Sequence, residues 1–343
     1  MTDQIRPEQT SPAVGLDVGT SRIVVAHRTG GQVAYESQLN AFVTVPHSKI
    51  TQTAFERENV PHAVLGSEIS VHGNESQRFA TYVNAEMRRP MTKGVLDAKE
   101  PESLRVIRDI LTSMLKAASP AGNADRPKQK LCFTIPAAPF GAESMLTYHE
   151  TTLRQILTEL GYQPVAINEG LAVIYGELEA SNYTGIGISC GGGLCNVCLA
   201  YLSVPVVSFS VPKAGDFIDA SAASVTGERS HLVRLAKEDS FHFNGFFADK
   251  MHQVIGVYYD DMIRTLVTAL KDSFAKTMNM PAFNRPIPIV LSGGTALPAG
   301  FRDRFEKILW EQDFPIQISE IRMSSDPLHS TAKGALVYAL SDL

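Results

Sequence analysis

The sequence predicts an α/β protein made of two related halves. Runs of β-branched and aromatic residues, typical of buried strands, alternate with amphipathic helical patterns through most of the chain. In addition, the segment 14–19 (Val-Gly-Leu-Asp-Val-Gly) aligns with the segment 186–191 (Ile-Gly-Ile-Ser-Cys-Gly) half a chain further on. In each copy a strand leads into a glycine turn and a second strand. Two copies of this unit in 343 residues predict two similar domains that face each other across a cleft.

The predicted strands are short runs with turn residues on either side. They cover 14–18, 23–26, 131–135, 163–167, 185–189, 196–201, 204–211 and 287–292. Apolar residues at helical spacing predict three helices, the first beginning near Pro101 and the second capped by Gly161. Their apolar faces are Leu104, Ile107, Leu111 and Met114; Leu153, Ile156, Leu157 and Leu160; and Met251, Ile255, Tyr258, Met262, Leu266 and Leu270. The stretches 117–130 and 279–285 predict loops.

The composition excludes several classes of protein. Hydrophobic residues make up 44% of the chain and charged residues 20%, which is ordinary for a globular protein, and a net charge of −5 gives no nucleic-acid-binding signature. The segment 1–12 contains Pro7 and Pro12, and Ile5 is its only bulky apolar residue beyond Met1. It therefore predicts neither a signal peptide nor a membrane-anchoring helix. We expect a cytoplasmic protein with no nucleic-acid partner and no membrane anchor.

The two glycine turns are candidates for phosphate binding. The first turn is Gly19-Thr20-Ser21 and the second is Gly191-Gly192-Gly193. Glycine lets backbone N–H groups approach phosphate oxygens without a Cβ in the way, and the hydroxyls of the first turn add donors. Asp17 ends the strand before the first turn, where it can hold a magnesium ion through water. A plain hairpin turn is the alternative for either glycine segment taken alone.

Five segments together resemble the actin superfamily, which also contains the heat-shock chaperone ATPases and the sugar kinases. Segments 15–21 and 191–193 resemble its two phosphate motifs, and 291–296 resembles its adenosine motif. Segments 168–172 and 330–335 resemble the two helices that connect its domains. The five segments occur in the family's order along most of the chain, and they are specific only in combination. The bacterial actins of the MreB and MamK type are the most similar members.

The resemblance implies ATP and Mg²⁺ as cofactors and assigns roles to individual residues. Glu169 matches the side chain that orients the water attacking the γ-phosphate; the alternative is that it only complements a helix dipole. At the ribose, the choice between Glu228 and the helical set Arg234, Lys237 and Glu238 stays open, as does the alternative of a solvated charged face. The remaining nucleotide-binding residues that the resemblance implies are Asp17, Gly19, Thr20, Ser21, Gly191, Gly192, Gly193, Gly215, Asp216, Gly293, Gly294 and Thr295.

The chain departs from the family pattern in two ways. The second phosphate motif has Ser189 and Leu194 where the family has an aspartate and a threonine, so we expect tight binding with slow turnover. No extra sheet is predicted before Ile287, so the outer subdomain of the second half, about 226–286, is expected to be reduced. We expect a first domain at 13–168, with an inserted subdomain at about 42–96 and the C-terminal helix 327–343, and a second domain at 169–326.

The resemblance favours an actin-like cytoskeletal protein that binds ATP, hydrolyses it slowly and assembles with itself into filaments. The main alternative is a non-polymerising ATP-binding scaffold of the same fold, which Ser189 and the reduced outer subdomain favour. A chaperone-type ATPase is disfavoured because the chain ends directly after the second connecting helix, and a sugar kinase because its catalytic aspartate has no clear counterpart. An iron–sulfur cluster at Cys190, Cys195 and Cys198 is disfavoured because strand residues three apart point to opposite faces. ATP and GTP are not distinguished.

Overall fold

The computed structural model describes residues 13–118, 129–138, 143–243, 246–247 and 249–341. The segment 1–12, for which we expect no membrane anchor, lies outside the described residues, as does most of the predicted loop at 117–130. Within the described ranges, none of the helices combines the length and apolar character needed to cross a bilayer.

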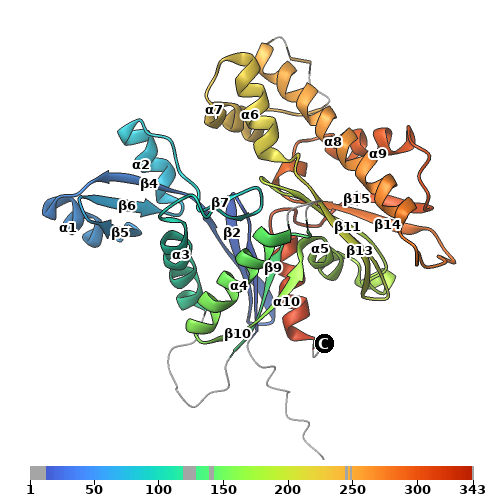
Figure 1. Ribbon diagram of the computed structural model, residues 1–343, viewed down its shortest axis with the longest axis horizontal. Coiled ribbons are helices and arrows are strands. Elements are labelled where there is room, and N and C mark those ends of the chain that lie inside the picture. The colour runs from blue at the N-terminus through green and yellow to red at the C-terminus, as the bar shows by residue number, and fades with distance from the viewer. Residues whose placement is uncertain (1–12, 119–128, 139–142, 244–245, 248, 342–343) are drawn as a thin grey trace, which may run out of the picture.

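Two five-stranded sheets of the same topology form the frame of the molecule (Figure 1). The first has the order β3-β2-β1-β9-β10 and the second has the order β13-β12-β11-β14-β15. In each sheet three consecutive antiparallel strands are extended by two parallel strands. The repeated sequence units form β1 and β11, the central strands of the two sheets, so the α/β class and the internal repeat are confirmed. The strands are β1 (Ala13–Val18), β2 (Arg22–Thr29), β3 (Gln32–Leu39), β9 (Gln129–Ile135), β10 (Tyr162–Asn168), β11 (Gly185–Cys190), β12 (Cys195–Tyr201), β13 (Val204–Val211), β14 (Ile287–Ser292) and β15 (Ile318–Met323).

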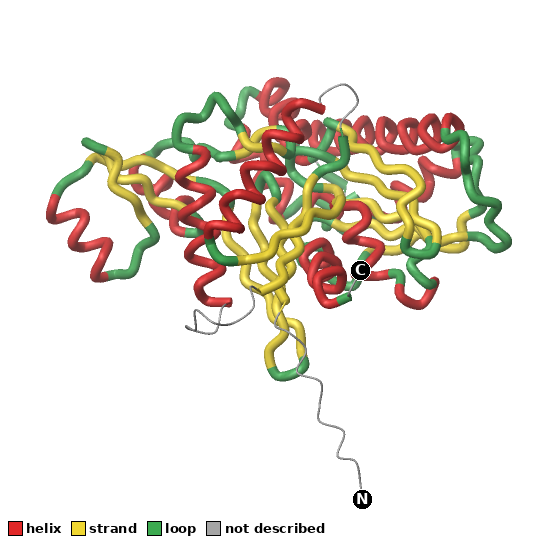
Figure 2. The backbone as a smooth tube through the Cα atoms, turned by 60° about the horizontal axis from the view of Figure 1, so that its bottom comes forward, coloured by secondary structure: helices red, strands yellow, loops and turns green. Residues whose placement is uncertain are grey.

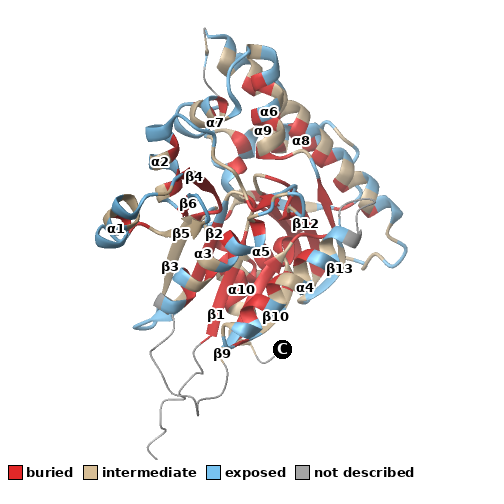
Figure 3. Cartoon of the chain, turned by 60° about the vertical axis from the view of Figure 1, so that its left-hand side comes forward, coloured by how far each residue is buried: buried red, intermediate tan, exposed pale blue. Residues whose placement is uncertain are grey.

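Helices cover the outer faces of both sheets and fill the space between them (Figure 2). On the outer face of the first sheet lie α3 (Ser103–Ala118) and α4 (Glu143–Glu159). On the outer face of the second lie α6 (Gly215–Thr226), α8 (Lys250–Lys276) and α9 (Phe301–Trp310). Between the sheets, α5 (Glu169–Glu177) packs on the second and α10 (Ser330–Leu340) on the first. Most of both central helices and the strands beside them are buried (Figure 3).

The two central helices touch backbone to backbone. A Cβ added at Gly334 of α10 would lie 1.7 Å from the carbonyl oxygen of Ala172 in α5. A Cβ at Gly15 of β1 would lie 2.2 Å from the carbonyl oxygen of Ala332. Both positions need glycine, because a side chain at Gly334 would push the two helices apart and one at Gly15 would push α10 away from β1.

A small subdomain is inserted between β3 and α3. It contains a three-stranded sheet with the order β4-β6-β5, the helices α1 and α2, and a hairpin formed by β7 and β8. It extends away from the second half at the left of Figure 1. Its elements are β4 (Phe42–Pro46), α1 (Lys49–Arg57), β5 (His62–Leu65), β6 (Glu68–His72), α2 (Glu75–Val83), β7 (Met91–Thr92) and β8 (Val95–Leu96). The hairpin turn points back toward the cleft between the halves, as described below.

In the second half, the described residues between α6 and β14 form helices and no strands. They contain α7 (Ser230–Asp239) and the long α8. Because α8 packs on α6 and β13 within the core of the second half, it covers the sheet and does not stand apart from it. Two 3₁₀ turns, Glu179–Ser181 and Gly294–Ala296, complete the helical elements.

One predicted helix face needs correction. Leu104 is 42% exposed, and the buried face of α3 runs instead through Val106, Ile107, Ile110 and Leu111. Val106 and Ile110 are also spaced to lie on one face of a helix, so the sequence allows two rotations of α3 about its axis. Packing against the sheet selects the rotation that buries Val106 and Ile110. Sequence patterns also missed β3 to β8 and β15, which are short, half-buried or lacking in strict alternation.

Candidate functional site

A cavity of about 540 Å³ lies where the two halves meet. Both glycine turns, the start of α6, one face of α7 and the loops beside the 3₁₀ turn Gly294–Ala296 and α10 line it. Of the residues proposed from the sequence, its lining includes Asp17, Gly19, Thr20, Ser21, Glu169, Gly191, Gly192, Gly193, Gly215, Asp216, Arg234, Lys237, Glu238, Gly293, Gly294 and Thr295. Glu228 is exposed and lies outside this lining. The fold therefore gathers residues from all five family-like segments at one place.

The two glycine turns approach each other closely. A Cβ at Gly192 would lie 2.3 Å from Ser21 Oγ, and one at Gly193 would lie 2.5 Å from the backbone nitrogen of Gly94. Gly94 sits at the tip of the β7–β8 hairpin and donates its N–H to Thr20 Oγ1 at 3.1 Å. The small subdomain therefore touches both turns. A side chain at Gly192 or Gly193 would fill the space where the backbone N–H groups are accessible.

Asp17 is held by hydroxyl groups from two other elements. Its Oδ1 accepts a hydrogen bond from Thr134 Oγ1 at 2.5 Å, and its Oδ2 accepts one from Thr331 Oγ1 at 2.6 Å. Burial raises the pKa of Asp17, and the two hydroxyl donors oppose that rise. Thr134 is on β9 and Thr331 on α10, so no local sequence pattern could have predicted either contact.

Glu169 begins α5 and points into the cavity wall beside the second glycine turn. Asn168 caps this helix by accepting hydrogen bonds from the N–H groups of Gly170 and Leu171. Glu169 Oε2 accepts hydrogen bonds from Asn196 Nδ2 at 2.9 Å and from Ser189 Oγ at 3.2 Å. Burial, followed by the nearby Asp17 carboxylate, raises the pKa of Glu169 to about 8.

Asn196 is a site residue that sequence reasoning missed. Its Nδ2 donates to Glu169, while its Oδ1 accepts a hydrogen bond from the backbone nitrogen of Ala137 at 3.0 Å. Both ends of the amide are therefore used, which fixes its orientation. Asn196 pairs with Ser189 across β11 and β12. The repeated strand–turn–strand unit could have predicted that Asn196 lies near the second glycine turn, but not that it binds Glu169.

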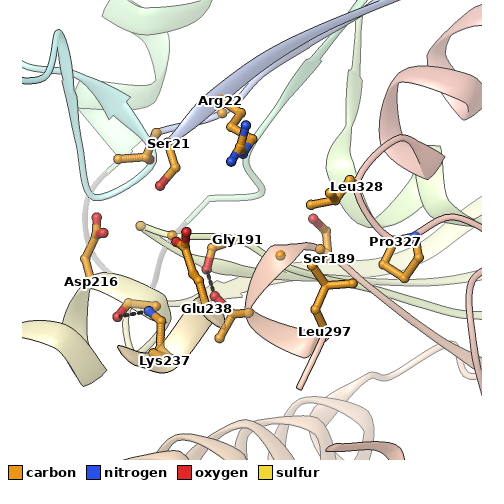
Figure 4. A pocket seen from close by; sticks show the side chains of 18 of the residues that line it. Ser21, Arg22, Ser189, Gly191, Asp216, Lys237, Glu238, Leu297, Pro327 and Leu328 are labelled. Atoms are coloured by element: carbon orange, nitrogen blue, oxygen red, sulfur yellow. Dashed lines mark hydrogen bonds between the residues drawn. The ribbon is translucent and has the colours of Figure 1, made fainter. Parts of the chain in front are cut away.

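Apolar side chains line one wall of the cavity. Leu297 and Leu328 are 48% and 38% exposed, and Figure 4 shows them with Pro327 on the same side. Gly294 adjoins this wall, since a Cβ there would lie 3.6 Å from Leu328 Cδ2. These residues come from two loops far apart in the sequence, so no spacing could have predicted them. An exposed apolar wall inside a polar cleft suits the flat face of a heterocyclic base.

Charged residues of α6 and α7 form another part of the lining. Lys237 Nζ is 2.6 Å from Asp219 Oδ1 and donates to the carbonyl oxygen of Gly215 at 3.1 Å, a contact drawn in Figure 4. Arg234 Nε lies 3.9 Å from Glu238 Oε1. Lys237 thus holds α7 to α6, whereas the carboxylate of Glu238 is half exposed.

An ion pair joins the halves next to the cavity. Arg89 Nη1 donates to Asp216 Oδ1 at 2.7 Å. Arg89 precedes the β7–β8 hairpin in the small subdomain, and Asp216 is in the first turn of α6. A second link lies within the second half, where Thr295 Oγ1 donates to the carbonyl oxygen of Gly191 at 2.7 Å. It ties the adenosine-like motif to the second glycine turn.

A divalent cation in this cavity would need the phosphates of a bound molecule to complete its coordination. Among the described residues, no group of three or more histidine, cysteine, aspartate or glutamate side chains is placed to share a metal ion. Asp17 and Glu169 nevertheless place two carboxyl groups near the glycine turns, and a cation bound beside them would favour their ionised forms. Mg²⁺ commonly takes one or two protein carboxylates together with substrate phosphates, so this donor set fits a metal–phosphate complex.

The three cysteines near the second glycine turn divide between the two faces of the sheet. Cys190 and Cys195 are cross-strand partners in the core of the second half. Cys198 packs instead among the residues around α5. All are buried free thiols.

Comparison with known proteins identifies the family. A model of the Volactin family matches residues 13–339. The chain belongs to this actin-like family. The resemblance to actin-like proteins that the five sequence segments indicated is therefore confirmed.

Two relatives named actin-like protein MamK extend the comparison. The one from Magnetospirillum gryphiswaldense is 26% identical over 242 residues, which are 68% of this chain and 59% of that protein. The one from Paramagnetospirillum magneticum is 24% identical over 68% of this chain and 61% of that protein. The matched region thus spans about three fifths of the length of these relatives.

Solved structures show that the Volactin-family chain has the actin-like fold. The MamK double helical filament matches with a TM-score of 0.71 and 19% identity, covering 96% of this chain and 99% of that one. MreB5 of Spiroplasma citri bound to AMPPNP matches with a TM-score of 0.67 and 14% identity, covering 96% of each chain. The fold predicted from the sequence, two related α/β domains around a cleft, is confirmed.

Proposed function

We propose that this protein binds ATP with Mg²⁺ between its two halves, hydrolyses it slowly and assembles with itself into filaments in the cytoplasm. The observation that carries the proposal is the pair of glycine turns facing each other in one cavity, where a Cβ at Gly192 would lie 2.3 Å from Ser21 Oγ. Backbone N–H groups left open by glycine from two directions suit a polyphosphate chain. The apolar wall at Leu297 and Leu328 suits the base.

The residues present fit a magnesium–nucleotide complex. Asp17 would hold the cation through water, with the phosphates as its other ligands. A bound cation would supply charge neutralisation for the phosphates. Glu169, once ionised, would accept a proton from a water molecule oriented by its own carboxylate, and Asn196 and Ser189 hold that carboxylate in place.

Self-assembly is supported by the family and by its relatives. The solved MamK structure is a double helical filament, and MreB5 was solved with AMPPNP and with ADP. An interface that joins unlike surfaces of two copies propagates into a filament when its rotation does not close. We infer that nucleotide binding between the halves sets the shape that allows such contacts.

Thermal melts with and without ATP and Mg²⁺ test the binding. A ligand at about 1,000 times its dissociation constant stabilises the native state by about 4 kcal/mol, so the melting temperature should rise by several degrees. Gly192→Val should abolish the rise because its side chain fills the space beside Ser21, whereas Gly256→Ala on α8 should keep it. If millimolar ATP does not change the melting temperature of the parent protein, nucleotide binding is contradicted.

Sedimentation and electron microscopy test the assembly. We expect pelletable filaments with ATP and Mg²⁺, and fewer of them with Gly192→Val. The second candidate function, a non-polymerising ATP-binding scaffold, is favoured by Ser189 in place of an acidic residue. Nucleotide-dependent melting without any pelletable polymer, across several salts and protein concentrations, would support the scaffold.

A further inference from the structure

Acidic side chains outnumber basic ones in the lining of the cavity. Its lining contains six acidic side chains and three basic ones, Arg22, Arg234 and Lys237. A polyphosphate would add further negative charge to this surface. Every basic side chain that is free to meet a phosphate therefore matters for binding, since charge-assisted hydrogen bonds are about twice as strong as neutral ones.

Two of the three basic side chains have protein partners. Lys237 is buried against Asp219 and the carbonyl oxygen of Gly215. Arg234 is paired only weakly, since its Nε lies 3.9 Å from Glu238 Oε1 on the same helix and has no hydrogen-bond partner among the described residues. Within the part of the chain that the structure describes, the guanidinium of Arg22 makes no hydrogen bond and no ion pair, although its side chain lines the cavity.

The backbone fixes Arg22 to the first glycine turn. The carbonyl oxygen of Arg22 accepts a hydrogen bond from the N–H of Gly19 at 2.9 Å, which closes the turn. In Figure 4 the exposed side chain points into the cavity, with Ser21 on one side and Leu328 on the other. Arg22 is therefore placed between the phosphate-binding turns and the apolar wall.

We propose that Arg22 binds the phosphate group next to the ribose of the bound nucleotide, an assignment that rests on the proposed nucleotide-binding function. If the glycine turns hold the terminal phosphates and the apolar wall holds the base, the group between them is the phosphate attached to the sugar. The planar guanidinium offers paired donors that match two phosphate oxygens. No sequence pattern predicted this role, because an arginine after a glycine turn is unremarkable by itself.

A series of ligands with three, two, one and no phosphate groups tests the assignment. Binding of ATP, ADP, AMP and adenosine is measured calorimetrically on the full chain at constant Mg²⁺, for the parent, Arg22→Met and Arg28→Met. Arg28 is the matched control because it is exposed on the same strand, at the end away from the glycine turn. We expect Arg22→Met to weaken ATP, ADP and AMP by similar factors, roughly 10- to 100-fold, and to leave adenosine unchanged. Arg28→Met should bind all four as the parent does, and Arg22→Lys should recover part of the loss.

Each other outcome overturns the assignment in a recognisable way. Loss for ATP alone would place Arg22 at the terminal phosphate, and equal loss for adenosine would mean that its guanidinium stacks on the base. Unchanged affinities with a binding-competent parent would mean that Arg22 makes no contact. A parent that binds none of the four ligands would contradict the proposed function itself, and this assignment would fall with it.

Discussion

Ser189 donates its hydroxyl hydrogen to Glu169 Oε2 across 3.2 Å, on the wall of the cavity between the two halves. From the sequence, Ser189 stands where the family has an aspartate, which predicts slow turnover. The structure adds a second role, because a hydroxyl can donate to the buried carboxyl group while an ionised aspartate would repel it. The residue at position 189 therefore affects the protonation of Glu169 in addition to the binding of a metal ion.

Ser189→Asp should destabilise the free protein and make its stability depend on magnesium. Two carboxyl groups would then share a buried site, so the melting temperature at pH 7.5 should fall, and Mg²⁺ should restore part of it. Ser189→Ala is the control, since it loses only one hydrogen bond, costing about 1 kcal/mol with no response to Mg²⁺. An aspartate variant that melts like the parent in both conditions would contradict this electrostatic role.

ATP hydrolysis should increase with pH through the pKa of Glu169. A base must be ionised to accept a proton, and burial raises the pKa of this carboxyl group to about 8. Phosphate release should therefore rise between pH 6.5 and 8.5. Glu169→Gln should lose about 10²-fold or more of the rate, down to the detection limit, with little change in nucleotide affinity. A flat profile, or a glutamine variant as fast as the parent, would show that Glu169 is not the base.

Glu169 should also make the fold less stable as pH rises. The unfolded chain releases this proton near the ordinary pKa of 4.5, while the folded protein keeps it until about pH 8. The free energy of unfolding contributed by this group therefore falls as pH increases between these values. Urea unfolding at pH 5, 6.5 and 8 should show a smaller decline for Glu169→Gln than for the parent. Parallel declines would argue against the raised pKa.

Gly334→Ala should destabilise the protein strongly. Its Cβ would fall 1.7 Å from the carbonyl oxygen of Ala172, which is backbone and cannot swing aside. We expect a loss of about 3 kcal/mol or more in the free energy of unfolding. Gly256→Ala in α8 meets nothing closer than 3.7 Å and should be neutral or stabilising by up to about 1 kcal/mol. Similar melting temperatures for the two variants would contradict the tight helix contact.

Breaking the Arg89–Asp216 ion pair should speed nucleotide release. The pair joins the small subdomain to α6 beside the cavity, at 2.7 Å. It is partly exposed, so its energy is about 0.2–1 kcal/mol and the release rate should rise only about 1.4- to 5-fold. Stopped-flow release of a fluorescent nucleotide would show this for Arg89→Ala and for Asp216→Asn. If the pair is the cause, the double variant will release no faster than either single one.

The sequence predicted the strands and turns of the repeated unit well, because local signals determine them. β1 and β11 are buried apolar runs that end at glycine turns, and Gly161, predicted as a C-terminal cap, follows α4 with a positive φ. The residues of both glycine turns and the start of α5 consequently meet in one cavity, as the five segments had indicated.

The contacts that complete the site were beyond reach of sequence patterns. Thr134 and Thr331 meet at Asp17 although 197 positions separate them in the numbering, and Leu297 and Leu328 line the same cavity from different loops. Such pairs depend on the arrangement of the sheets and helices, not on spacing. The choice between the two predicted ribose-binding sets was open for the same reason. It depends on the position of α7, which brings Arg234, Lys237 and Glu238 to the cavity, whereas Glu228 lies outside its lining.

The contact of Gly334 with Ala172 limits how the two halves can move. With backbone against backbone at this point, the two helices cannot press closer without a clash. Rotation about this contact is the motion that it opposes least. The contact then acts as the fulcrum of a lever, and the small subdomain, which extends far from it in Figure 1, is the long arm. A slight closure around a ligand would thus displace the outer edge of the molecule much more than the cavity itself.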